Sequence, residues 1–336
     1  MLIGLLGGDG KILVAGWAHD GSNRQGITLT RYNADGSLDE GFGDHGLFIL
    51  PNGAYAHSLA IDSDGKALIG GIITIEQARP ERGPGISVVT GLFFLTRVNE
   101  AGLLDRNFGE NGFVATDVGG VDKLSALTIQ RDGKIVVSGT GHKDSRPRMI
   151  VARYDSRGSL DRTFGINGLV VRDLEKGQYD WATVSELPDR KLIVSSSVWS
   201  EKHLLLTRLL HNGAIDPAFA VGGCLTVQTG SLRERTLPVL EPDGKLLVSG
   251  RVIRTPKAGE SQPPYYYDIV AARYLPDGRS DPSFGPDGMQ VVSTGTTITQ
   301  VAKVLAQEDG RVIVVGNTFN ENKVDDGHLV LLGFRR

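Results

Sequence analysis

The chain has 336 residues, of which 40% are hydrophobic and 22% charged, as expected for a globular protein with a hydrophobic core. A net charge of −3 argues against a broad nucleic-acid-binding surface, and a single cysteine, Cys224, excludes an intrachain disulfide. No apolar run is long enough for a membrane helix, and the N-terminal sequence lacks the features of a signal peptide, so we expect a soluble, cytoplasmic protein if the natural chain begins there.

An octamer recurs six times along the chain. It reads DGKILVAG at its first occurrence, from Asp9, and related octamers begin at Asp64, Asp132, Asp189, Asp243 and Asp309. A second phrase, LTRYNADGSLDEGFGDHG in copy one, follows the octamer in five of the six copies. A fixed period of this kind is typical of repeat architectures.

Each copy contains short aliphatic or β-branched runs separated by turn residues, which predicts four strands in copies one to five and three in copy six. The Asp-Gly pairs predict tight hairpins between the first two strands. With no helical pattern between the strands, these periods favour an all-β, six-bladed β-propeller of four-stranded antiparallel blades, the last blade short of one strand. The predicted single domain spans 1–336, with blades at about 1–50, 51–116, 117–172, 173–228, 229–293 and 294–336.

Copy three, DGKIVVSG…IVARYDSRGSLDRTFGINGLVV, resembles the bacterial delta-60 (DUF5122) β-propeller repeat. The resemblance extends over nearly the whole chain and implies a propeller fold, but the family has no common activity that it would transfer. Copy four departs from the pattern with DRK in place of DGK and with Ala220 after Phe219.

Two local patterns suggest ligands that the repeat does not support. GFGDHG, residues 41–46, has the spacing of a dinucleotide-binding loop, but the other copies lack its first glycine and no helical pattern follows. Asn33, Asp35 and Asp39 have the spacing of calcium ligands, but only the last aspartate persists in the other copies. We therefore interpret both as turns and expect neither a cofactor nor a metal.

An arginine lies eight residues before an aspartate in five copies, and copy six lacks both. This co-occurrence predicts five bidentate ion pairs with a structural role, and a phenylalanine that follows each pair is predicted to fill the core. The pairs are Arg31–Asp39, Arg97–Asp105, Arg153–Asp161, Arg208–Asp216 and Arg273–Asp281, and the phenylalanines are Phe42, Phe108, Phe164, Phe219 and Phe284.

Function is expected where the repeat is interrupted. Two insertions, 76–91 and 254–267, fall at the same end of the predicted strands. Aromatic side chains near this end suit a glycan, peptide or protein ligand. The candidate ligand-binding residues are Trp17, Tyr55, Tyr179, Trp181, Trp199, Tyr265 and Tyr266.

We interpret the chain as a non-catalytic binding or scaffold protein. The alternative is a hydrolase or lyase in which His57, Asp180 and Glu234 meet at the mouth of the central channel. A further role follows from the last blade, whose third strand would be an open edge at which a second copy of the chain could pair.

Overall fold

The computed structural model describes residues 3–7, 9–19, 25–50, 54–78, 87–119, 123–143, 146–174, 179–198, 203–228, 238–241, 243–254, 266–293, 298–306, 312–320 and 323–334. These residues form antiparallel sheets and contain no α-helix, so the prediction of an all-β chain with four-stranded antiparallel sheets is confirmed for them. The chain forms two compact units, Met1–Lys176 and Gly177–Arg336.

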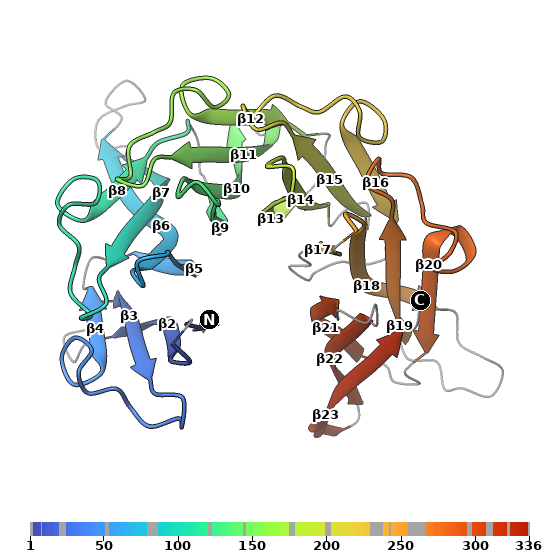
Figure 1. Cartoon of the computed structure of the whole chain (residues 1–336), viewed down its shortest axis with the longest axis horizontal. Helices are drawn as coiled ribbons and strands as arrows, with labels where there is room; N and C mark the ends of the chain where they lie inside the picture. The colour runs from blue at the N-terminus through green and yellow to red at the C-terminus, as the bar shows by residue number, and fades with distance from the viewer. Residues whose placement is uncertain are drawn as a thin grey trace. The chain divides into compact units, whose positions relative to one another are not determined.

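The first unit contains three sheets, each with four strands in chain order (Figure 1). Sheet one comprises β1 (Ile3–Leu6), β2 (Ile12–His19), β3 (Gln25–Tyr32) and β4 (Leu47–Leu50). Sheet two comprises β5 (Tyr55–Ile61), β6 (Ala67–Ala78), β7 (Ser87–Val98) and β8 (Phe113–Thr116). Sheet three comprises β9 (Lys123–Ile129), β10 (Ile135–Lys143), β11 (Arg146–Tyr154) and β12 (Leu169–Asp173).

The second unit contains the remaining sheets. Sheet four comprises β13 (Tyr179–Glu186), β14 (Leu192–Val198), β15 (His203–Leu209) and β16 (Cys224–Gln228). Sheet five comprises β17 (Val239–Leu240), β18 (Leu246–Arg254), β19 (Tyr266–Tyr274) and, after the 3-10 turn η2 (Pro286–Gly288), β20 (Met289–Ser293). Sheet six comprises β21 (Ile298–Ala306), β22 (Val312–Asn320) and β23 (Lys323–Phe334).

The octamer forms the hairpin between the first and second strands of a sheet. Its glycine adopts a left-handed conformation, as at Gly133 with φ of 80°, which a residue without a Cβ adopts without strain. In copy four Arg190 takes the same conformation, with φ of 64°. The DRK variant of the octamer therefore keeps the turn, at the cost of a left-handed conformation in a residue that has a Cβ.

A second glycine of the octamer faces an irregularity in the first strand. In sheet three the register of β9 and β10 shifts between Ser138 and Gly139. A Cβ on Gly139 would lie 2.1 Å from the carbonyl oxygen of Lys123. The bulged strand therefore approaches β10 so closely that only glycine fits opposite it.

The hydrophobic core lies between successive sheets within each unit. One cluster joins sheets two and three through buried side chains such as Phe93, Phe108, Leu124 and Ile150. Another joins sheets four and five and includes Phe219. The five phenylalanines of the second phrase are at most 2% exposed, in agreement with their predicted place in the core. No helix in the described ranges is long and apolar enough to cross a membrane.

Candidate functional site

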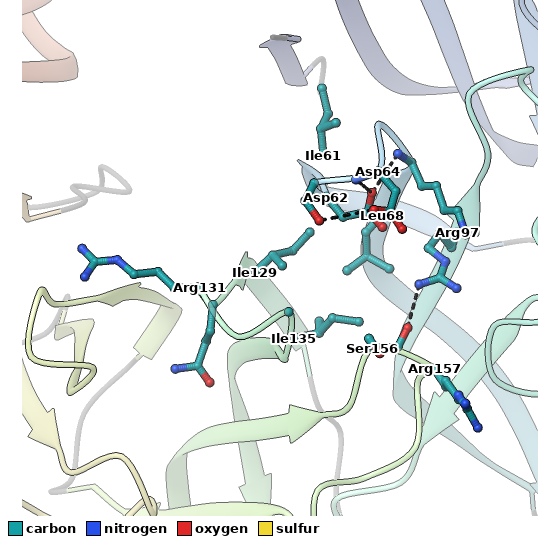
Figure 2. Close-up of a pocket in the computed structure, with 14 residues that line it drawn as sticks. Ile61, Asp62, Asp64, Leu68, Arg97, Ile129, Arg131, Ile135, Ser156 and Arg157 are labelled. Carbon is teal, nitrogen blue, oxygen red and sulfur yellow. Dashed lines mark hydrogen bonds between the residues drawn. The ribbon is translucent and has the colours of Figure 1, made fainter.

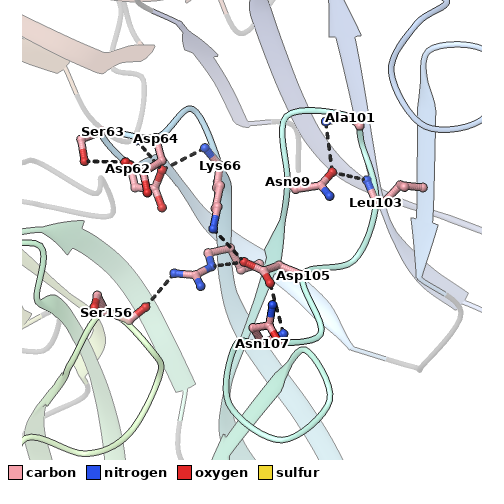
Figure 3. Close-up of polar contacts among 11 residues, drawn as sticks. Asp62, Ser63, Asp64, Lys66, Asn99, Ala101, Leu103, Asp105, Asn107 and Ser156 are labelled. Atoms are coloured by element: carbon pink, nitrogen blue, oxygen red, sulfur yellow. Dashed lines mark hydrogen bonds and ion pairs between the residues drawn. The ribbon is translucent and has the colours of Figure 1, made fainter.

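The charged residues of the repeat meet where one sheet adjoins the next. In copy two, the Oδ2 atom of Asp105 accepts hydrogen bonds from Arg97 Nε at 3.0 Å and from Lys66 Nζ at 3.2 Å (Figure 3). Its Oδ1 atom accepts the backbone N–H of Asn107 at 3.1 Å. The arginine guanidinium carbon lies 4.7 Å from the ring centre of Phe108. We call the four side chains of Lys66, Arg97, Asp105 and Phe108, and their equivalents in other copies, the seam cluster.

The seam cluster recurs with nearly the same geometry in copies one to five. The Arg Nε to Asp Oδ2 distances are 2.6 Å for Arg31–Asp39, 2.9 Å for Arg153–Asp161, 2.8 Å for Arg208–Asp216 and 2.8 Å for Arg273–Asp281. The corresponding lysines are Lys11, Lys134, Lys191 and Lys245. A side-chain set repeated in this way acts on the repeat itself and not at one catalytic centre.

The arginine also reaches the following sheet. Nη1 of Arg97 donates to the backbone carbonyl of Ser156 in copy three at 2.6 Å, and Nη1 of Arg31 donates to that of Glu100 in copy two at 2.6 Å. Arg208 makes the same bond to Pro276. The seam cluster therefore fastens each of these turns to its own sheet and to the next.

Two sequence expectations about this cluster need correction. The predicted bidentate arginine–aspartate geometry is wrong for Arg31, Arg97 and Arg208, in which Nε donates to the carboxylate while Nη1 donates to a backbone carbonyl of the next copy. The lysine was missed altogether. Its signal was present in the sequence, since the lysine of the octamer occurs in the five copies that also have the aspartate, whereas copy six has Arg311.

The seam contacts stabilise the charged form of the aspartates. Lys11, with a further contribution from Arg31, lowers the pKa of Asp39 to about 2 against the opposing effect of burial. At Asp281 burial alone would raise the pKa, but hydrogen bonds from Ser283, aided by Arg273, outweigh it and lower the pKa to about 2. These carboxylates are held ionised, which suits ion pairing and not proton transfer near neutral pH.

A pocket of about 420 Å³ opens between sheets two and three, beside the seam cluster of copy two. Figure 2 shows the aliphatic side chains of Leu68, Ile129 and Ile135 directed toward the same space, with Arg97 at its side. An equivalent pocket of about 620 Å³ lies between sheets one and two beside Lys11 and Arg31. Both lie at the end of the strands where the first hairpins turn.

His57 is the only one of the three proposed catalytic side chains whose contacts are described. Its Nδ1 atom lies 2.8 Å from the backbone carbonyl oxygen of Leu124, so the ring donates a hydrogen bond from sheet two to sheet three. Next to it, the Ser58 hydroxyl accepts the backbone N–H of Leu127 at 3.0 Å. For Asp180 the structure describes the backbone alone, and Glu234 lies outside the described residues.

The candidate aromatic residues differ in what the structure says of them. Trp181 is 3% exposed and packs in the core between sheets four and five, so its ring is a packing group rather than a surface contact. Tyr55 is half-buried on β5. Trp199 and Tyr265 lie outside the described residues, and for Trp17, Tyr179 and Tyr266 only the strand is described.

The calcium-like spacing in copy one forms a turn. Asp35 Oδ1 accepts the backbone N–H of Ser37 at 2.9 Å and its hydroxyl at 2.6 Å. Asp39 belongs to the seam cluster, where it pairs with Lys11 and Arg31. Among the residues for which the structure gives side chains, no three His, Cys, Asp or Glu side chains are grouped to hold a metal ion.

Comparison with known proteins bears on the family and the fold. Residues 7–42 and 130–164 match a family model described as a DUF5122 beta-propeller domain of unknown function. A crystal structure of a protein of unknown function from Dyadobacter fermentans DSM 18053 is 13% identical, with a TM-score of 0.52 over 99% of this chain and 94% of that one. At this identity the similarity concerns the fold alone. No curated protein matches the sequence.

Weaker similarities to enzymes carry no argument about function. The polysaccharide lyase Uly1 is 10% identical, with a TM-score of 0.47 over 97% of this chain and 80% of that one. A GH43 β-1,3-galactosidase is 12% identical, with a TM-score of 0.37 over 90% of this chain and 58% of that one.

Proposed function

We propose that this chain, which matches the DUF5122 beta-propeller family model over residues 7–42 and 130–164, has its six sheets as the blades of a single closed propeller and is a non-catalytic binding protein. In this proposal residues 1–336 form one domain. The ligand is a glycan, peptide or protein, recognised on the face that carries the 76–91 and 254–267 loops.

The observation that carries this proposal is the use of the recurrent charged residues. Lys66 and Arg97 are both engaged with Asp105, and the equivalent residues of the other four copies pair in the same way. Arg31, Arg97 and Arg208 also bind the next sheet. His57 likewise serves a contact between two sheets. The shared residues thus account for holding the repeats together, which leaves recognition to the residues that differ between copies.

The insertion in copy two has the geometry of a recognition element. β6 and β7 are each 12 residues long, and they remain paired as far as Ala78 and Ser87. The corresponding strands of sheet three, β10 and β11, have nine residues each. The insertion therefore prolongs an ordered hairpin beyond its sheet, and projecting loops on a rigid scaffold are common binding elements.

Binding is tested with a glycan array and a peptide library applied to the intact chain. We expect Tyr266→Ala and Trp199→Ala to weaken a hit at least tenfold while the melting temperature stays within about 2 °C. His45→Ala serves as the control, because its side chain is 87% exposed and lies in a turn of copy one. A hit that survives both aromatic substitutions would rule out this face as the binding site.

The alternative, a hydrolase or lyase, requires His57, Asp180 and Glu234 to converge. In that case Glu234→Gln would abolish turnover of a polysaccharide substrate without reducing its binding. Our proposal expects no turnover in the unaltered chain.

We also propose that a second copy can pair at the edge of sheet six. In the described ranges β23 pairs with β22 on one side, and no strand covers its other side. An uncovered strand edge is a template for pairing between chains. Val330→Pro, which removes a backbone donor in the middle of β23, is expected to convert a dimer in sedimentation analysis to a monomer.

A further inference from the structure

The lysine of the seam cluster has different surroundings in different copies. In copies three, four and five the lysine lies near two carboxylates, one from the aspartate of the second phrase and one from the aspartate of its own octamer. The distances from Nζ to the octamer aspartate are 3.9 Å for Lys134–Asp132, 3.2 Å for Lys191–Asp189 and 3.0 Å for Lys245–Asp243. In copies one and two the lysine Nζ pairs, among the described residues, with the second-phrase aspartate alone, at 2.8 Å for Lys11–Asp39 and 3.2 Å for Lys66–Asp105, and makes no such contact with the octamer aspartate, Asp9 or Asp64.

Copy two therefore presents two cations, Lys66 and Arg97, to one carboxylate, that of Asp105. Both cations line the 420 Å³ pocket between sheets two and three. Lys66 is 31% exposed, so its ammonium group is within reach of a ligand in that pocket. In copies three, four and five the equivalent ammonium group has a second partner, a carboxylate oxygen about 3 to 4 Å away.

The charges around this pocket favour an anion. Four cationic residues and two acidic ones line it, and with Asp105 counted the balance is still positive. Arg131 and Arg157 extend away from the space in Figure 2, so they act through their field and not by contact. In the equivalent pocket between sheets one and two, acidic residues outnumber cations, since Asp9, Asp62 and Glu100 face Lys11 and Arg31.

Aliphatic side chains form the remaining wall of the pocket between sheets two and three, where Ile61 and Ile129 are half-buried beside Leu68. A carboxylate with a short hydrocarbon chain combines the two required properties, because its charge would meet Lys66 and its chain would cover these aliphatic groups. We propose that this pocket binds a small aliphatic carboxylate through Lys66, at the opposite end of the strands from the loops of the proposed recognition face.

The test compares hexanoate with hexanamide, which has the same chain and no charge, by calorimetric titration of the full chain. We expect hexanoate to bind at least about tenfold more tightly, a difference of about 1.4 kcal/mol. Lys66→Ala should remove this preference. Lys11→Ala is the matched control, because Lys11 is the equivalent lysine of the seam cluster in copy one and pairs with Asp39 at 2.8 Å. It lies beside the pocket in which acidic residues outnumber cations, so its removal should leave hexanoate binding unchanged.

Asp64→Asn provides a test in the opposite direction. Asp64 is the octamer carboxylate that could compete for Lys66, so its neutralisation should tighten hexanoate binding. Equal binding of hexanoate and hexanamide to the unaltered chain would overturn the proposal, whatever the variants do. A loss of hexanoate binding in Lys11→Ala as large as the loss in Lys66→Ala would also overturn the proposal. It would show that weakening the seam cluster of another copy reduces binding just as much. Neither outcome bears on the recognition face, where Tyr266 and Trp199 are tested separately.

Discussion

Arg97 and Asp105 are joined by one hydrogen bond, from Nε to Oδ2 at 3.0 Å, while Nη1 of the same arginine binds the carbonyl of Ser156 in the next sheet. The guanidinium is also stacked on Phe108, with 4.7 Å from its carbon to the ring centre. One side chain thus fixes the turn of its own copy, covers the core and holds the neighbouring copy. The planar, permanently charged group of arginine is suited to this combination, and the ammonium group of lysine is not.

We expect Asp105→Ala to lower the free energy of unfolding by about 2–4 kcal/mol, because Arg97 and Lys66 would lose their shared acceptor in a largely buried place. Chemical denaturation followed by tryptophan fluorescence measures the change. Asp44→Ala is the control, since that side chain is 95% exposed and contacts only His45, at 3.8 Å, among the described residues. If the two variants were equally stable, the seam cluster would have no role in stability.

The aspartates of the seam cluster also predict how stability depends on pH. Lys11, and then Arg31, lower the pKa of Asp39 to about 2, below the ordinary value of 3.8. A group whose pKa is depressed by folding contributes stability above its unfolded pKa and loses it as the pH falls through the folded pKa. The contribution of Asp39 is therefore complete above about pH 4 and declines toward pH 2.

Carboxyl-carbon NMR titration measures this shift directly. In Lys11→Ala the pKa of Asp39 should move up toward 3.8, since the largest cause of the shift is removed. In the unaltered chain the melting temperature should fall between pH 4 and pH 2, and this fall should be smaller in Lys11→Ala. A melting temperature that rises with acidification would contradict the assignment.

Much of the fold could be predicted from the sequence because each copy repeats the same local signals. In copy three the runs SALTIQ, KIVVSGT, MIVARYD and GLVVRD predict four strands, and the structure has β9, β10, β11 and β12 at these places. The Asp-Gly pair in five of the six octamers predicts a hairpin, and the structure has this hairpin with a left-handed glycine, as at Gly133. The strands and hairpins depend on residues that are close together in the sequence, so a local sequence pattern is enough to predict them.

The seam geometry could not be predicted in the same way. Lys66 and Asp105 are 39 residues apart and meet through the pairing of β6 with β7, whereas Arg97 and Ser156 are 59 residues apart and meet only because sheet three stacks on sheet two. Trp181 illustrates the same limit, because the register shift of β13 between Tyr179 and Ala182 falls beside it, and its ring packs in the core. The spacing of residues within one repeat predicts contacts inside that repeat, but it does not predict which residues of the next sheet they contact.

Gly139→Ala tests the close approach of the first and second strands in sheet three. The added Cβ would lie 2.1 Å from the carbonyl oxygen of Lys123 and 2.8 Å from the ring of Phe93, so β9 would have to move. We expect a loss of about 1–3 kcal/mol, as for other overpacked positions. Gly333→Ala on β23 is the control, because a Cβ there meets nothing within 4 Å. Equal stability of the two variants would show that the bulge adapts without cost.

Tyr154→Phe tests a buried hydrogen bond between sheets two and three. The Tyr154 hydroxyl donates to Thr116 Oγ1 at 2.7 Å, and the tyrosine is 1% exposed. Burial, opposed in part by this hydrogen bond, raises the pKa of the tyrosine well above its ordinary value, so the hydroxyl stays neutral and able to donate. Its removal should cost about 0.5–1.5 kcal/mol.

Tyr274→Phe in copy five is the matched variant for this test. Tyr274 occupies the same place at the end of the third strand and is 8% exposed, but its hydroxyl has no hydrogen-bond partner among the described side chains. We expect this substitution to leave the free energy of unfolding nearly unchanged, because it removes a hydroxyl that makes no hydrogen bond to the described side chains. Since both changes delete one oxygen from a tyrosine at equivalent positions, the difference between them isolates the bond to Thr116. A larger loss in Tyr274→Phe than in Tyr154→Phe would show that this bond does not contribute to the contact between sheets two and three.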